Sequence, residues 1–279
     1  MVSIKLSKGL NISLKGKAAP TVKEVALGED FAIVPAAFEG LTPKVLVKQG
    51  DKVLAGDALF QSKGCDVVKV VSPVSGTVTE VVRGERRKVL LVKVQADKVQ
   101  EQKDFGKKDI SRMSGEEIVS LLSESGMMAF VNQLPYDVVV RDPAVTPKAI
   151  FVSAFRDMPL EAEAVVEFAG EDANFKDGVA ALAKIAKIYV GICEEQDGQG
   201  FTNGLDAEVA VFKGKCPAGN VSVQVNHLDP VNKGEIVWTV DPMAVVFIGR
   251  LLNTGKVDFS RVVAVAGSEM NEPCYVKAV

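Results

Sequence analysis

The chain has 279 residues, which is long for a single domain and predicts two domains that each bury a core. Apolar residues make up 47% of it and charged residues 25%, as in an ordinary globular protein, and its net charge of −3 offers no basic face for nucleic acid. Residues 1–17 alternate polar and apolar side chains without the apolar stretch of a signal peptide, so we expect a cytoplasmic location.

The sequence argues against a membrane-spanning helix and against a metal site. The longest apolar run, residues 243–252, contains Arg250 and is far shorter than the about 20 residues that a spanning helix needs. The cysteines are far apart and show no C-x-x-C spacing, which argues against iron–sulfur and zinc sites (Cys65, Cys193, Cys216 and Cys274). We therefore expect reduced thiols and no metal site.

Residues 45–82 predict a small all-β module. Gly50-Asp51 and Gly56-Asp57 supply turns within two near-repeats of strand, turn and strand. The pattern resembles the biotinyl/lipoyl carrier domain, a β barrel-sandwich that holds its prosthetic group on a lysine of an exposed hairpin turn. That turn contains Lys63 here, but Cys65 stands where the modified lysine would align. We therefore favour a barrel kept for packing or docking over a carrier.

A cluster of cations follows the barrel-like strands. Arg83, Arg86 and Arg87 lie with Lys88 around Glu85, in a predicted hairpin tip. Such a tip is either simply solvated or forms a docking patch that contacts an anion. The sequence favours the solvated tip and leaves docking by these three arginines open.

A linker and a capped helix come next. Residues 95–108 are polar and predict the linker. Ser114 is a typical N-cap, the acidic pair Glu116 and Glu117 occupies the first turn, and apolar residues at helical spacing run to an end near Gly126.

From residue 146 onward, predicted strands and helices alternate, which is typical of a parallel α/β domain. We expect strands at 149–154, 187–193, 208–213, 221–225, 236–240 and 261–266, and helices at 175–186 and 242–252. The predicted fold class is thus α/β (α+β multidomain), with a biotinyl/lipoyl-like β barrel-sandwich followed by a Rossmann-like three-layer α/β domain. Its predicted parts are the β-rich residues 1–100, the linker and capped helix 101–145, and the α/β residues 146–279.

Three features of residues 146–279 resemble catalytic or nucleotide-binding sites, but each is a weak signal. His227, the only histidine, follows the predicted strand 221–225, which favours a hydrogen-bonded loop histidine over a catalytic one. Residues 198–204 nearly match the dinucleotide fingerprint, but a predicted strand follows where the fingerprint needs a helix, so we favour a surface loop. The loop 213–220 lacks the G-K-S/T ending of a phosphate loop and predicts a connection.

Motifs along the whole chain resemble the A subunits of sodium-translocating NADH:quinone oxidoreductases. They include IKLSKGLNI at 4–12, SPVSGTV at 72–78, KAIFVSA at 148–154, DPVN at 229–232 and RVVAVAG at 261–267. Members of that family continue with a small β-grasp-like domain and a helical tail, so we expect a truncated chain.

The resemblance implies a peripheral subunit of a six-subunit membrane pump, on the cytoplasmic face of the bacterial inner membrane. The complex passes electrons from NADH to quinone and exports Na⁺. Its flavins, its iron–sulfur centre and the NADH and quinone sites are expected on other subunits, and the quinone-binding membrane subunit is the expected principal partner. The isolated chain is not expected to be active, and we expect it to have no catalytic residue.

The resemblance also bears on flavin binding. Relatives that carry the flavin of respiratory complex I hold it in a glycine-rich loop, and the corresponding segment here, residues 125–136, keeps only Gly126. A flavin phosphate and ring need the close backbone approach that glycine permits, and Met127, Met128 and Phe130 would fill that space. We infer that the chain binds neither FMN nor NADH.

The same apolar residues suit a quinone. Phe130, Leu134, Pro135 and Tyr136 could line an apolar cleft with a polar handle. The resemblance adds a second segment, from Phe31 to Pro35. Ordinary core packing explains these residues equally well.

Two functions of different classes therefore remain. The preferred one is a cofactor-free scaffold and quinone-contacting subunit of the redox pump. The alternative is a biotin- or lipoate-type carrier fused to an α/β enzyme domain. An autonomous dinucleotide-binding oxidoreductase that uses the loop 198–204 is a weaker third.

Overall fold

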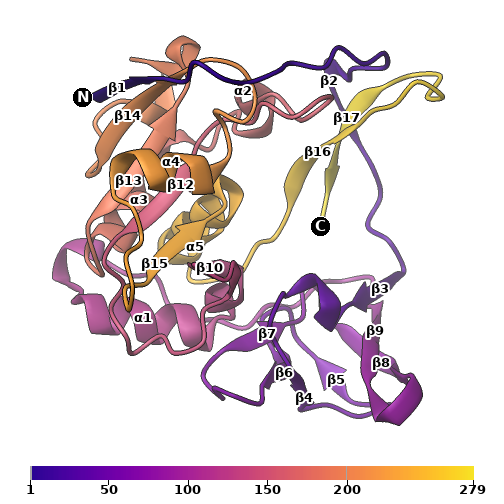
Figure 1. Ribbon diagram of the computed structural model, residues 1–279. Helices are drawn as coiled ribbons and strands as arrows, with labels where there is room; N and C mark the ends of the chain where they lie inside the picture. Colours follow the sequence, from indigo (N-terminus) through magenta and orange to yellow (C-terminus); the bar gives the residue numbers. More distant parts are fainter. Residues whose placement is uncertain (1, 199) are drawn as a thin grey trace.

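The computed structural model describes residues 2–198 and 200–279, and it shows a β barrel-sandwich beside an α/β domain, with a small separate sheet at the upper right of the view (Figure 1). The described residues contain no helix long and apolar enough to cross a membrane.

The barrel-sandwich is built from two sheets. One has the order β3-β9-β8-β5, with β3 at Asp30–Ile33, β9 at Val89–Ala96, β8 at Gly76–Arg83 and β5 at Lys52–Val53. The other has the order β4-β6-β7, with β4 at Pro43–Val45, β6 at Ala58–Ser62 and β7 at Lys69–Val71. Their inner side chains form one core around Leu59 and Phe60, both fully buried. The strand pattern of residues 45–82 is thereby confirmed.

The α/β domain has a seven-stranded sheet with the order β1-β14-β13-β12-β15-β10-β11. The four parallel strands at its centre are β12 (Ile150–Ser153), β13 (Ile188–Ile192), β14 (Glu208–Lys213) and β15 (Val237–Val240). Across the sheet they lie in the order β14-β13-β12-β15. Numbered by their order in the chain, this is 3-2-1-4, the Rossmann arrangement. The antiparallel strands β10 (Val131–Leu134) and β11 (Val138–Val139) extend the sheet on the β15 side.

Helices cover both faces of this sheet, which gives the predicted three layers. One face carries α1 (Gly115–Glu124), α3 (Asp172–Ala183) and α5 (Pro242–Thr254), which pack on alternate strand residues such as Val152 and Val190. The other face carries α4 (Val221–Leu228), which packs on Phe151 and Tyr189. Ser114 caps α1 as the sequence predicts, and the structure adds a reciprocal capping box, since Ser114 accepts from the Glu117 amide and Glu117 from the Ser114 amide.

The helix α4 corrects the prediction of a strand at 221–225. Its valines favour a strand locally. The Asn220 side chain, however, accepts hydrogen bonds from the amides of Ser222 and Val223 and so caps a helix. Val225 then packs against the sheet, so tertiary contacts outweigh the local propensity.

The ends of the chain pair with distant segments. Strand β1 (Val2–Lys5) lies parallel to β14 at the edge of the α/β sheet. Strand β2 (Ala19–Glu24) joins β16 (Arg261–Val265) and β17 (Cys274–Ala278) in a separate three-stranded sheet, so the strand expected at 261–266 is formed but stays outside the α/β sheet. The short helix α2 (Ala164–Glu167) anchors that sheet, because Arg261 pairs with Glu167 at 2.7 Å.

Candidate functional site

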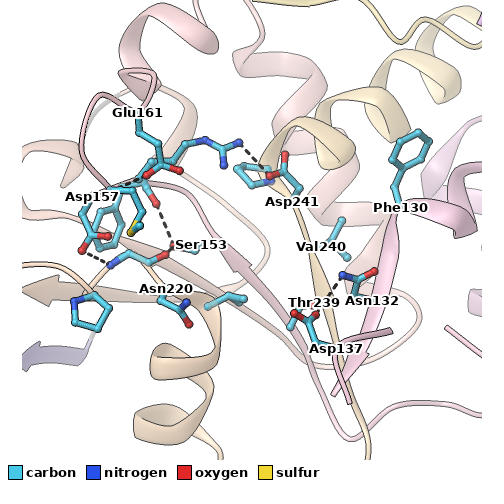
Figure 2. A pocket seen from close by; sticks show the side chains of 17 residues that line it. Phe130, Asn132, Asp137, Ser153, Asp157, Glu161, Asn220, Thr239, Val240 and Asp241 are labelled. Carbon is cyan, nitrogen blue, oxygen red and sulfur yellow. Dashed lines mark hydrogen bonds and ion pairs between the residues drawn. The ribbon is translucent and has the colours of Figure 1, made fainter. Parts of the chain in front are cut away.

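A cavity of about 340 Å³ lies at the carboxyl ends of β12 and β15, where the sheet order reverses (Figure 2). In open α/β sheets, ligands bind in the crevice at this reversal. Three stretches of chain meet here: the loop after β12, the loop before α4, and the ends of β10 and β15. The polar and aromatic side chains that line the cavity include Phe130, Asn132, Asp137, Ser153, Arg156, Asp157, Glu161, Asn220, Thr239 and Asp241.

An ion network holds the loop after β12. Arg156 donates from Nη2 to Asp241 at 3.0 Å and from Nε to Glu167 at 3.2 Å, and Glu167 is almost fully buried. Burial alone would lower the pKa of Arg156, but the carboxylates of Asp241 and Glu167 outweigh it and raise that pKa. Arg261 binds the other oxygen of Glu167. The charge of Arg156 is therefore already balanced within the protein.

A second set of hydrogen bonds holds the loop before α4. The Gly219 amide donates to Asp157 at 2.8 Å, and Ser153 donates to the Gly219 carbonyl at 2.8 Å. The buried Gln224 side chain donates to Ser153 at 2.9 Å. A Cβ at Gly219 would lie 2.9 Å from Asp157 Oδ1, so glycine lets the loop approach this closely.

The third wall comes from β10 and β15. Asn132 and Thr239 are register partners on these antiparallel strands. Asn132 donates to Asp137 at 3.2 Å. Thr239 is only 6% exposed and lines the cavity, yet its hydroxyl has no hydrogen-bond partner in the described part of the chain (Figure 2).

The charge of the cavity does not fit a phosphate. Four carboxylates line it (Asp137, Asp157, Glu161 and Asp241) against the single cation Arg156. Both neighbouring helix N-termini are capped by their own side chains, α5 by Asp241 and α4 by Asn220. Amides that would otherwise bind a phosphate are thus already satisfied. Among the described residues, no group of three or more potential metal ligands gathers here or elsewhere.

The segment 125–136, where flavin-binding relatives would have their glycine loop, is a wedge between the two domains. The 3₁₀ helix Met127–Phe130 buries Met127 and Met128 in the α/β core and Ala129 in the barrel core. Gly126 has φ +79°, and a Cβ there would lie 2.7 Å from Val71 Cγ1 on β7. These side chains fill the junction between the two cores.

The structure separates the quinone candidates predicted from sequence. Phe31 lies half-buried on β3 and Pro35 is buried just after it, both on the barrel. Phe130 lines the cavity, and its ring contacts those of Phe38, Phe247 and Phe259, with centroids 5.4–6.1 Å away.

The other three candidates lie apart from Phe130. Leu134 is buried in the cluster that faces α4, with Phe151 and Val237. Pro135 is exposed, and Tyr136 is 73% exposed with Arg141 over its ring at 5.7 Å. The structure therefore does not bring Leu134, Pro135 and Tyr136 into one cleft with Phe130.

The remaining sequence candidates lie on the surface. Arg83, Arg86 and Arg87 are exposed at the tip of the β8–β9 hairpin, and Arg86 and Arg87 adopt positive φ. Lys63 is exposed in the turn between β6 and β7. His227 is hydrogen-bonded, as expected, but it lies in the last turn of α4 and contacts the Val223 carbonyl at 2.8 Å.

The two glycine segments are connections. In the segment 198–204, Phe201 and Thr202 are buried, and Phe201 packs on Phe168 and Phe175. Residue 199 lies outside the described residues. The segment 214–220 leads into the cap of α4.

Sequence reasoning missed Ser153, Asp157 and Thr239. Ser153 ends β12 and Asp157 lies in the loop directly after it, whereas Thr239 lies on β15, so no local motif joins all three. A signal was nevertheless present: Ser153 ends the apolar run at 150–153, and Thr239 interrupts the one at 237–240. Polar residues at the carboxyl ends of parallel strands are where a site is expected.

Comparison with known proteins assigns both domains to one family. The family model of the NqrA N-terminal barrel-sandwich hybrid domain matches residues 4–97, and that of the NqrA second alpha/beta domain matches residues 113–257. Proteins named as the A subunit of Na(+)-translocating NADH-quinone reductase are similar over 97–98% of the chain: those of Marinomonas sp. (strain MWYL1) and Hahella chejuensis at 32% identity and that of Saccharophagus degradans at 31%. The chain spans 61–62% of the length of these relatives. Since the second-domain model alone covers more than half of the chain, the chain belongs to the NqrA family.

Proposed function

We propose that the chain acts as a peripheral, cofactor-free subunit of a Na⁺-pumping NADH:quinone oxidoreductase. It would lie on the cytoplasmic face of the bacterial inner membrane, where the complex couples NADH oxidation and quinone reduction to Na⁺ export. The observation that carries this proposal is that both NqrA domain models match in order, over residues 4–97 and 113–257.

The geometry of the cavity supports a role without a flavin or NADH. Its carboxylates and its two capped helix N-termini oppose a phosphate. In the segment 125–136, Met127 and Met128 are buried in the core, which supports the proposal because a flavin would need open space beside the backbone there. The chemistry of electron transfer would then belong to partner subunits.

Two exposed surfaces support docking to these partners. The extended segment after β1 exposes Leu10, Ile12 and Leu14 by 56–66%. Contiguous exposed apolar side chains mark interaction sites. On the barrel, Arg83, Arg86 and Arg87 project from the hairpin tip without an ion pair in the described part of the chain, so they are free to contact an acidic partner.

Quinone contact is the finer part of the proposal. Phe130 is the candidate that lines the cavity, and its ring could pack on a quinone head. Phe31 and Pro35 would offer a contact on the barrel, and Pro135 and Tyr136 one on the exposed loop between β10 and β11. Leu134 would support that loop from the core.

Docking is tested by sedimentation with bacterial membranes that contain the other five subunits of the pump but lack its NqrA subunit. We expect the chain to sediment with these membranes and not with membranes that lack the pump. Replacing Arg83, Arg86 and Arg87 by Gln should weaken this association, whereas replacing Lys103, Lys107 and Lys108 by Gln should not. Equal sedimentation with both membranes, or with neither, would contradict the proposal.

Quinone contact is tested by ligand-observed NMR of a short-chain ubiquinone with the purified chain. Saturable transfer that falls in Phe130→Leu places the quinone in the cavity, and a fall in Tyr136→Ala places it on the loop. Val99→Ala, at a side chain 79% exposed, is the control and should change nothing. Absence of saturable transfer to the chain would oppose a quinone contact here.

A carrier function is the second candidate, because Lys63 is exposed on a barrel hairpin turn, as in carrier domains. Intact mass after expression with biotin and lipoate ligases decides between the two. A mass increase that Lys63→Arg removes would establish the carrier. An unmodified mass supports the scaffold.

A further inference from the structure

The cavity between β12 and β15 has an acceptor-rich wall that the proposed scaffold role does not use. Asp157, Asp137 and Glu161 accept from the Gly219 amide, the Asn132 side chain and the Met158 amide, and the Cys216 thiol also contacts Asp157. A carboxylate has two oxygens and about four acceptor positions. Each of them can therefore accept another hydrogen bond from a ligand.

Thr239 indicates independently that a polar ligand belongs here. Its side chain is more than nine-tenths buried, and its hydroxyl faces the cavity without a partner among the described residues. In the described part of the chain the fully enclosed side-chain atoms without a partner are Trp238 Nε1 and Arg261 Nε, so the Thr239 hydroxyl is still open to the cavity. A ligand that encloses this hydroxyl without bonding to it would incur a cost of about 1–3 kcal/mol. A ligand oxygen in the cavity would supply that partner.

The rest of the lining limits the class of ligand. Arg156 is paired with Asp241 and Glu167, and so gives little net attraction for an anion. The half-buried Phe130 lines the cavity and adds an apolar contact, which suits a flat ring. The volume of about 340 Å³ lies at the small end of the range for ligand pockets, which suits one ring system with its substituents.

We propose that this cavity binds an uncharged ring compound that donates hydrogen bonds from hydroxyl groups and carries no phosphate. Asp157 and Asp137 accept from its hydroxyls, Thr239 bonds one of its oxygens, and the ring packs on Phe130. The ribose of a nucleoside and the reduced, quinol form of a quinone share this chemistry. Only the quinol source rests on the function proposed above.

The test compares matched pairs of probes by ligand-observed NMR. Adenosine is set against AMP, and a short-chain ubiquinol, kept reduced without oxygen, against the corresponding ubiquinone. We expect adenosine or the ubiquinol to bind saturably. AMP adds negative charge beside carboxylates, and the ubiquinone has acceptors where the wall needs donors, so each should bind at least about tenfold more weakly than its partner.

Variants locate the binding. Thr239→Val keeps the shape and removes the hydroxyl, and Asp157→Asn removes the charge; each should weaken binding about tenfold. Thr77→Val on β8 and Asp142→Asn, whose carboxylate accepts from the Ala144 amide, are controls outside the cavity that should leave binding unchanged. Circular dichroism confirms that all four variants are folded.

Three results would overturn the proposal: no binding of adenosine or ubiquinol, equal binding of both members of each pair, or unchanged binding in Thr239→Val. Binding of adenosine alone identifies a nucleoside site, and binding of the ubiquinol alone a quinol site. The sedimentation test does not involve this cavity, so the proposed function and this inference can fail separately.

Discussion

The barrel and the α/β domain differ in the kind of polar group that they bury and in whether each buried group has a hydrogen-bond partner. In the barrel, the buried polar side chains are Ser72 and Ser75, and both have backbone partners: Ser72 donates to Val74 and Ser75 accepts from the Glu101 amide. The α/β domain buries charges, including Glu167 and Arg250, and leaves the buried Trp238 Nε1 without a partner among the described residues. A satisfied core favours a structural role, whereas polar groups retained at a cost in stability mark the part of the molecule where ligand chemistry is expected.

The largest expected effect is at the buried carboxylate. Glu167→Ala leaves Arg156 and Arg261 without their shared partner and should destabilise the protein by about 3–5 kcal/mol. The exposed barrel pair Lys93–Glu80 provides the contrast, because Glu80→Ala should cost less than about 1 kcal/mol. Urea unfolding measures both, and equal costs would remove the difference between the domains.

The junction of the two domains comes next. Gly126→Ala forces a Cβ against Val71 and should destabilise the protein by about 1–3 kcal/mol. Gly50 has a similar positive φ of 90° but no neighbour within 4 Å of a Cβ, so Gly50→Ala isolates the backbone strain. Thermal unfolding should show a larger loss for Gly126→Ala. An equal loss would show that the wedge does not couple the domains sterically.

A smaller effect is expected at the capping box of α1. Ser114→Ala removes the acceptor for the Glu117 amide and should cost about 1 kcal/mol. Ser222→Ala, at an exposed position in the first turn of α4, is the control and should change stability little. Urea midpoints measure the two variants. A control as costly as Ser114→Ala would show that the cap is not the cause.

We also expect the loss of stability at acidic pH to arise in the α/β domain. Burial alone would raise the pKa of Glu171, but hydrogen bonds from Arg250 and Asn174 hold that pKa below its ordinary value of 4.5. The interaction therefore stabilises the fold above pH 4.5 and is lost as the pH falls through the lowered value. Glu171→Gln should lessen the dependence of unfolding on pH in this acidic range. An unchanged pH profile would contradict this role.

Much of the fold could be predicted because its signals are local. The α1 cap at Ser114 and the Asp241-Pro242 start of α5 each lie within a few residues of the helix they begin. The pairing of β1 with β14 joins segments about 200 residues apart and has no local signal. At 221–225, valines favour a strand until the Asn220 cap and the packing of Val225 are known.

The candidate site was harder to predict for the same reason. Phe130 and Leu134 are close in sequence, yet the chain carries their side chains into different clusters. Ser153 and Asp157 are as close in sequence as that pair, but Thr239 is about 80 residues away, and only the strand order brings it to the same cavity. Proximity in sequence was therefore a poor guide to this site.

The α/β domain keeps the strand order of a nucleotide-binding domain, while the carboxylates and capped helices of its crevice oppose phosphate. Titration with FMN, followed by flavin fluorescence, and with NADH, followed by the fluorescence of the buried Trp238 on β15, tests this most directly. We expect no saturable change with either ligand. Saturable binding of FMN or NADH that Thr239→Val weakens would contradict the claim.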